Sequence, residues 1–228
     1  MDRLTRTVSA VALVGAPLLL LAYFVTFPAY GEIHGDDVAR AVSADPEMTR
    51  VADVFAFVGV FLAVPATLAY MRLLRPTSPK LATLGGGAAI LGWMGLVGAL
   101  MTDVVATEIG GHVALFEDVY SSPIVVGLSA VTSLHVVGSV LIGAALVRTR
   151  LVAQPLGVAF TVAAPTHLAA NLAGQLWLDV ITWLVTAATG AVVAAHFLRE
   201  ASDTPESSSR ARARGPATSG EAHLIGRF

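Results

Sequence analysis

The chain has 228 residues, of which 55% are hydrophobic and 13% charged, and its formal net charge is -2. About a quarter of the residues of a soluble domain are charged, so this composition excludes an ordinary water-soluble protein and predicts an all-α integral membrane protein. The chain has no cysteine, which excludes disulfides, thiolate catalysis and cysteine-ligated metals or clusters.

Six apolar runs follow one another, each near the length of about 20 residues that a helix needs to cross a hydrocarbon core of about 30 Å. They cover residues 8–27, 51–71, 81–106, 123–147, 151–174 and 177–198. No small-x-small cleavage site follows the first run before Pro28, so we expect an uncleaved first helix and no signal peptide. Residues 1–200 are therefore predicted to form one six-helix transmembrane domain.

The charged residues divide between the two sides of such a bundle. Twelve of the fourteen Lys and Arg residues fall on one side, the exceptions being Arg40 and Arg50. The positive-inside rule makes that side cytoplasmic and places both termini there. Eleven of the sixteen acids fall on the outer side: Glu32, Asp36, Asp37, Asp45, Glu47, Asp53, Asp103, Glu108, Glu117, Asp118 and Asp179.

The connections and the tail have their own patterns. The outer segment 36–42 begins with two acids and continues with alternating apolar positions, which predicts a short helix at the membrane interface that covers the bundle mouth. Residues 113–116 are a second candidate for a short interfacial turn. The segment 201–228 is rich in Ser, Arg, Pro, Gly and Ala, which predicts a disordered cytoplasmic tail.

The third apolar run contains six glycines, at positions 85, 86, 87, 92, 95 and 98. Small residues at such spacing let two helix backbones approach closely. We therefore expect this helix to be central and its glycines to serve packing.

Polar side chains inside a span cost roughly 2.5–3.5 kcal/mol on insertion scales and are candidates for function. His135 should lie roughly 18 Å and His167 roughly 11 Å below the outer surface, and the uncertainty of the span ends can bring them level. We expect a polar pocket in the outer half of the last four spans. The candidates for catalysis are His135, His167, Asp103 and Asp179, and those for ligand binding are Asn171, Gln175, Thr132 and Asp53.

Four interpretations of this pocket remain open. The polar groups can hold the helices together by hydrogen bonds. An enzyme could use a histidine as acid or base, with an acid as its partner, on a lipid-soluble substrate. A transporter could collect cations or protons at the acidic mouth. His135 and His167 could also be the axial ligands of a b-type haem, and a metal site with His34, His112 or outer acids is a related idea.

One resemblance supports the fold. The segment Val64-Pro65-Ala66-Thr67-Leu68-Ala69-Tyr70-Met71-Arg72, the following Ser78-Pro79-Lys80 and the short helix expected after the first span resemble the DUF4386-like group of six-helix actinobacterial membrane proteins. The resemblance spans most of residues 1–200 and implies the fold but no activity. Where that group often has His-Pro after the first span, this chain has Phe27-Pro28-Ala29.

The sequence thus predicts a multi-pass protein of the cell membrane that binds a small apolar or amphipathic ligand or has a structural role. Catalysis, ion or proton-coupled transport and haem binding are the alternatives. The expected partners are membrane lipids and a lipid-soluble small molecule, with no nucleic acid. The oligomeric state and the cofactor stay open.

Overall fold

The structure, a computed structural model, describes residues 3–32, 34–109 and 113–202. That part of the chain consists of helices with short connections and contains no strand, so the predicted all-α class is confirmed. Its helices are α1 (Arg3–Thr26), α2 (Gly35–Ala44), α3 (Pro46–Leu74), α4 (Pro79–Ile109), α5 (Val113–Tyr120), α6 (Pro123–Thr132), α7 (Leu134–Thr149), α8 (Gln154–Leu172) and α9 (Leu176–Ser202). Beyond Ser202 the predicted tail lies outside the described residues.

Local signals set the helix ends. α3 begins at Pro46, where the N–H that proline lacks would have no partner within the helix. The Asp45 carboxylate caps this helix by accepting a hydrogen bond of 3.1 Å from the Met48 N–H. α8 ends at Leu172, and the turn to α9 uses Gly174 at φ +63°, a conformation that costs glycine little.

Five helical stretches are long and apolar enough to cross a membrane, and they correspond to five of the six predicted spans. They are Leu4–Thr26, Pro46–Leu74, Pro79–Val105, Pro123–Thr149 and Leu176–Arg199. The sixth prediction corresponds to α8, whose 19 residues include Gln154, His167 and Asn171. These polar residues lower the mean hydropathy of α8, so α8 is not among the five stretches.

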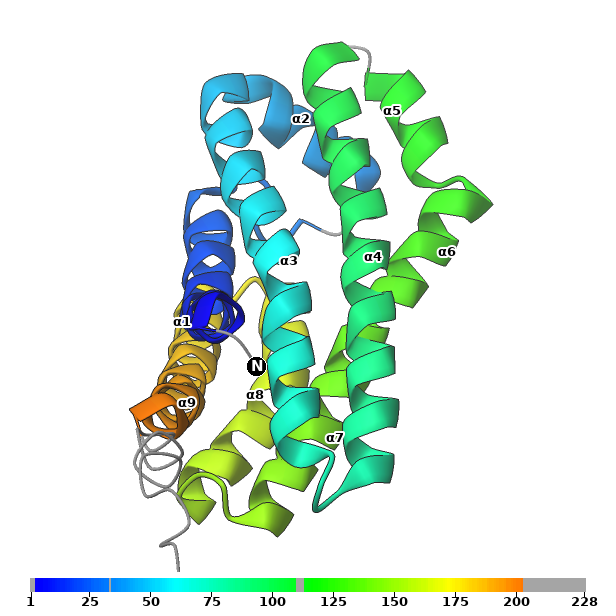
Figure 1. Cartoon of the computed structure of the whole chain (residues 1–228). Coiled ribbons are helices and arrows are strands. Elements are labelled where there is room, and N and C mark those ends of the chain that lie inside the picture. The colour runs from blue at the N-terminus through cyan, green and yellow to red at the C-terminus, as the bar shows by residue number, and fades with distance from the viewer. Residues whose placement is uncertain (1–2, 33, 110–112, 203–228) are drawn as a thin grey trace, which may run out of the picture.

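The long helices form a closed ring. α1 packs against α3 and α9, α4 packs against α3, α6 and α7, and α8 lies between α7 and α9 (Figure 1). The shorter helices α2 and α5 pack on each other at one end of this ring, where α2 also contacts α4. α2 buries Val38, Ala39 and Val42 against Phe27 and Tyr120, so its apolar face is held by the protein itself.

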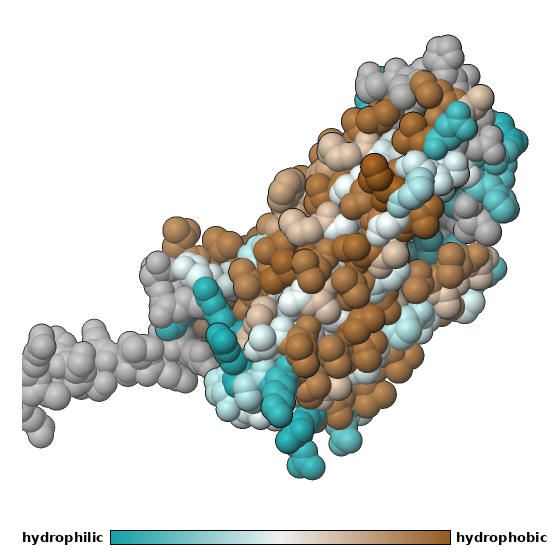
Figure 2. Space-filling model, turned by 90° about the vertical axis from the view of Figure 1, so that its right-hand side faces the viewer, coloured by the Kyte–Doolittle hydropathy of each residue, from teal (hydrophilic) through white to brown (hydrophobic). Residues whose placement is uncertain are grey.

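The outward faces of the long helices are apolar. Figure 2 shows apolar side chains over most of the face in view, with hydrophilic side chains gathered toward its ends. Phe61 and Ile124 are 63% and 76% exposed, and at most 44% of the most apolar stretch of each span is buried. Large exposed apolar surfaces are rare on soluble monomers, whereas lipid accommodates them. The fold is therefore compatible with a multi-pass membrane protein.

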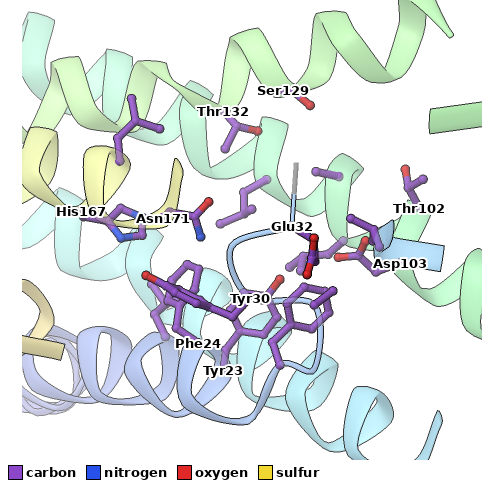
Figure 3. Close-up of a pocket in the computed structure, with 18 of the residues that line it drawn as sticks. Tyr23, Phe24, Tyr30, Glu32, Thr102, Asp103, Ser129, Thr132, His167 and Asn171 are labelled. Atoms are coloured by element: carbon purple, nitrogen blue, oxygen red, sulfur yellow. The ribbon is translucent and has the colours of Figure 1, made fainter. Parts of the chain in front are cut away.

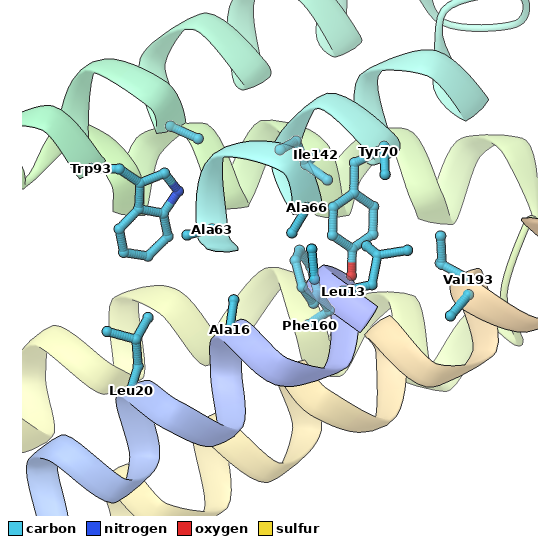
Figure 4. Packing of buried hydrophobic residues seen from close by; sticks show 14 of the residues in the cluster. Leu13, Ala16, Leu20, Ala63, Ala66, Tyr70, Trp93, Ile142, Phe160 and Val193 are labelled. Atoms are coloured by element: carbon cyan, nitrogen blue, oxygen red, sulfur yellow. The ribbon is translucent and has the colours of Figure 1, made fainter. Parts of the chain in front are cut away.

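The interior of the ring is built from one large apolar cluster. Leu13 and Leu20 of α1, Tyr70 of α3, Phe160 of α8 and Val193 of α9 meet there (Figure 4). Many of the other members are alanines. Because alanine is small, the helices can pack closely around this cluster.

The predicted packing role of the α4 glycines is confirmed for most of them. A Cβ at Gly92 would collide with the backbone of His135, and one at Gly95 would lie 2.7 Å from the Thr132 backbone nitrogen. A Cβ at Gly87, in contrast, would meet nothing within 4 Å. α4 thus crosses close to the junction of α6 and α7 and fixes the position of His135.

Candidate functional site

A cavity of about 260 Å³ lies at the end of the ring where α2 and α5 pack. Its walls come from α1 and the connection after it, from α2 and α5, and from α4, α6, α7, α8 and α9. Figure 3 shows His167 and Asn171 toward one end of the cavity, with Asp103 and Glu32 toward the other. Aromatic rings lie between the two ends.

At the end of the cavity that carries His167, two buried ionisable side chains form a pair. His167 Nδ1 lies 2.6 Å from Asp179 Oδ1, and the side chains are 11% and 0% exposed respectively. His167 lies near the end of α8 and Asp179 in the first turn of α9, so the tight turn at Gly174 brings them together. An ionised carboxylate only accepts hydrogen bonds. Nδ1 therefore donates, and Nε2 is left for a ligand or a proton.

Two hydroxyl groups complete the surroundings of Asp179. The Tyr30 hydroxyl donates to Asp179 Oδ2 at 3.2 Å, and the Thr182 hydroxyl lies 3.2 Å from Oδ1 and 2.8 Å from the Asp179 carbonyl oxygen. Burial, and then the negative charge of Asp179, raise the pKa of Tyr30 above its ordinary value. Tyr30 therefore stays protonated and remains a donor. Asp179 orients the His167 ring and is itself fixed by α9 and the loop after α1.

His135 lies beside this pair on α7. Its Nδ1 is 2.5 Å from the Thr132 carbonyl oxygen, which can only accept, so Nδ1 carries the hydrogen. Trp93 stacks on the ring with centroids 4.8 Å apart, and the centroids of the two imidazoles are 6.0 Å apart. Both histidines thus use Nδ1 for the protein and keep Nε2.

Two smaller cavities continue below the first. One of about 50 Å³ is lined by both histidines, Ser139 and Thr186, and another of about 60 Å³ reaches Tyr70. Trp93 and Trp183 line all three cavities. The Trp183 Nε1 and the Tyr70 hydroxyl are buried without a hydrogen-bond partner among the described residues. Polar groups therefore extend from the large cavity into the middle of the bundle.

The structure brings most of the predicted site residues together. His135, His167, Asp103, Asn171 and Thr132 line the large cavity, and Asp179 lies behind His167. Among them, His167 contacts Asp179, which is the pairing of a histidine with an acid that the enzyme interpretation requires.

Two of the predicted ligand-binding residues lie elsewhere. Gln175 was expected to continue the helical stripe of His167 and Asn171, but α8 ends before it, and its exposed side chain accepts a 3.0 Å hydrogen bond from Trp177 Nε1. Asp53 is buried on α3, the one ring helix that does not line the cavity, and its Oδ1 has no hydrogen-bond partner in the described structure. The end of α8 explains the position of Gln175, and the rotation of α3 explains that of Asp53.

Other residues of the site were not predicted. Tyr23, Phe24, Tyr30, Trp93 and Glu32 line the cavity. Phe24 packs edge-on to His167 with centroids 4.9 Å apart. Aromatic residues in an apolar run look the same in the sequence whether they fill a core or line a cavity. The outer acids were the one signal that could have singled out Glu32.

A metal site gains no support from the described residues, since no three His, Asp or Glu side chains among them are placed to hold an ion. The predicted candidate His112 and the side chain of Glu108 lie outside the described part. Comparison of the chain with family models, with curated proteins and with solved structures finds no match.

Proposed function

We propose that this chain is a six-span protein of the cell membrane, with both termini in the cytoplasm, that binds a small amphipathic molecule in the large cavity. The cavity carries this proposal. Small-molecule sites are concave and mostly apolar, with a few polar groups that fix orientation, and this cavity combines aromatic walls with Asn171, His167 and Asp103. Its volume of about 260 Å³ suits a small ligand.

The distribution of charge supports an outward-facing cavity. Val38 of α2 and Tyr120 of α5 line it, and both helices belong to the acid-rich end of the ring. Arg72, Arg75 and Lys80 cluster at the opposite end, around the connection from α3 to α4. The positive-inside rule makes that end cytoplasmic, so a ligand would enter from the outer side or the outer leaflet.

α8 is the sixth span in this proposal. Its 19 residues give a length of roughly 28 Å, close to the hydrocarbon thickness of about 30 Å. It lies between α7 and α9 in the ring, and its polar residues His167 and Asn171 face the cavity. Packing within the ring offsets its lower hydropathy.

The binding proposal predicts that a molecule copurifies with the protein from native membranes and is seen by native mass spectrometry. Ala99→Phe should abolish this retention, because residue 99 lines the cavity on α4 and the added ring would fill it. Met101→Phe is the matched control, since Met101 is on the same helix, 47% exposed and outside the cavity. Equal retention by both variants would contradict the proposal. A Soret band would favour the haem alternative.

The contact of His167 with Asp179 favours a second candidate, acid–base catalysis on a lipid-soluble substrate. Asp179 holds His167 through Nδ1 and leaves Nε2 at the cavity wall, the arrangement of an oriented general base. A bound molecule that the native protein converts, and that His167→Gln binds without converting, would support catalysis. Unchanged conversion by this variant would remove the candidate.

A further inference from the structure

The charged side chains at the outer end of the large cavity are both carboxylates. Asp103 and Glu32 lie there, and among the described residues no Lys or Arg lines any part of the cavity. We propose that the ligand is an organic ammonium ion, bound with its charged group at Asp103 and Glu32 and its apolar body against the aromatic wall. This inference rests on the proposed binding function and names the class of ligand.

Neither carboxylate forms an ion pair with a described residue, and Arg40 feels the charge of Glu32 only at longer range. Within the described part of the chain, no basic side chain lies within ion-pair distance of Asp103 or Glu32. The two outer arginines are engaged elsewhere: Arg40 pairs with Asp36 and Asp37, and Arg50 pairs with Glu47. Asp103 is only partly buried on α4. A carboxylate that is partly removed from water gains from a cation brought by a ligand.

The walls next to these acids suit a cation with an apolar body. Tyr23 and Tyr120 line the cavity near Asp103. Phe24 and Trp93 continue the aromatic wall toward the two histidines, and Figure 3 shows Tyr23 between the two ends. The faces of aromatic rings attract ammonium groups, and this attraction increases when the site excludes water. Carboxylates with aromatic walls therefore favour an ammonium ion over a neutral lipid.

The end of the cavity that carries the two histidines would not attract an anionic ligand instead. His167 is paired with Asp179, so a proton on its ring would be balanced by that carboxylate. His135 donates Nδ1–H to a carbonyl oxygen and stacks on Trp93. Asn171 adds a neutral amide. This end can bind a hydroxyl or carbonyl group, but it offers an anion no net positive charge.

The test uses the full-length protein in detergent and three probes of similar shape. These are benzyltrimethylammonium, its neutral carbon isostere neopentylbenzene, and the anion phenylacetate. Isothermal titration calorimetry should detect binding of the cation and much weaker binding of the other two. A neutral or anionic probe that binds as tightly as the cation would overturn the inference, whatever the behaviour of any variant.

Variants then locate the charged group. Asp103→Asn should weaken binding of benzyltrimethylammonium about tenfold to a hundredfold, because a charged partner is lost, while Asp103→Glu should keep most of the affinity. The control is Asp118→Asn, which removes an exposed outer acid that does not line the cavity. Equal loss in the two Asn variants would mean that only the surface charge matters, and would refute a specific site.

The cavity-filling variant separates this inference from the proposed function. If Ala99→Phe abolishes binding of a neutral probe that the native protein binds as well as the cation, the binding function stands and the ammonium preference is wrong. If Ala99→Phe binds every probe as the native protein does, the proposed function itself fails.

Discussion

Asp179 is held by donors from three parts of the chain. His167 of α8, Tyr30 of the loop after α1 and Thr182 of α9 all direct a polar hydrogen at its carboxylate, which is fully buried. A buried carboxylate without such partners would be costly. The three contacts therefore make the pair a structural link between α8, α9 and the loop after α1 as well as a candidate for chemistry.

Loss of this carboxylate should destabilise the protein. In Asp179→Ala the His167 Nδ1–H and the Tyr30 hydroxyl lose their acceptor, while Thr182 keeps the Asp179 carbonyl. We expect the free energy of unfolding to fall by on the order of 2 kcal/mol, with a smaller loss for Asp179→Asn. Thermal unfolding in detergent measures this. The exposed control Asp118→Asn should change stability by less than about 0.5 kcal/mol. A native-like stability of Asp179→Ala would contradict the structural link.

Sequence reasoning could find the polar centre of this site but not its surroundings. His135, His167 and Asp179 stand out because polar groups in apolar runs are few and costly. Tyr30 lies in a loop, and Phe24 looks like a core residue, so neither carries a comparable signal. Gln175 was assigned wrongly because the spacing of four residues continues past Leu172, whereas the helix does not.

At the level of helices, α4 is placed by its glycines. Gly92 and Gly95 lie against the junction between α6 and α7, at Ser133. The close approach fixes His135 next to Trp93. The spacing of small residues was enough to predict close packing, but the partner helix could not be predicted, since any of the other spans offers a compatible surface.

Two alanine substitutions on α4 should therefore have opposite effects. Gly92→Ala should lower the free energy of unfolding by about 1–3 kcal/mol, because its methyl group meets the His135 backbone and a backbone cannot move aside cheaply. Gly87→Ala should leave stability unchanged or raise it by up to about 1 kcal/mol, since the site is open and alanine favours helix. Thermal unfolding followed by circular dichroism compares them. Equal effects would mean that α4 does not pack on α7 in this way.

Over the whole molecule, the ring closes where α9 returns to α1. A Cβ at Gly190 of α9 would collide with the carbonyl of Leu13, so these two helices also approach closely. This closure brings residues of α1 into a cavity that the sequence assigned to the last four spans alone. The number and order of apolar runs could be read from the sequence, but the packing order depends on side-chain fit that one sequence does not reveal.

Cysteine labelling tests both the orientation and the number of spans, because the chain has no native cysteine. Ala44→Cys and Gln175→Cys, both at exposed positions, should react with an impermeant thiol reagent in intact cells, since both would lie outside. Thr77→Cys and Ala153→Cys are also exposed and should react only after the cells are permeabilised, which controls for their reactivity.

The Gln175 position decides the role of α8. If α8 crosses the membrane, Gln175 lies on the opposite side from Ala153, at the far end of a helix of 19 residues. If α8 does not cross, both cysteines share the cytoplasmic side and neither reacts in sealed cells. The first pattern supports six spans and a cytoplasmic carboxyl terminus, because α9 would then return the chain to the inner side. The second pattern, or labelling of Thr77→Cys in sealed cells, would overturn the proposed topology and with it the outward-facing cavity.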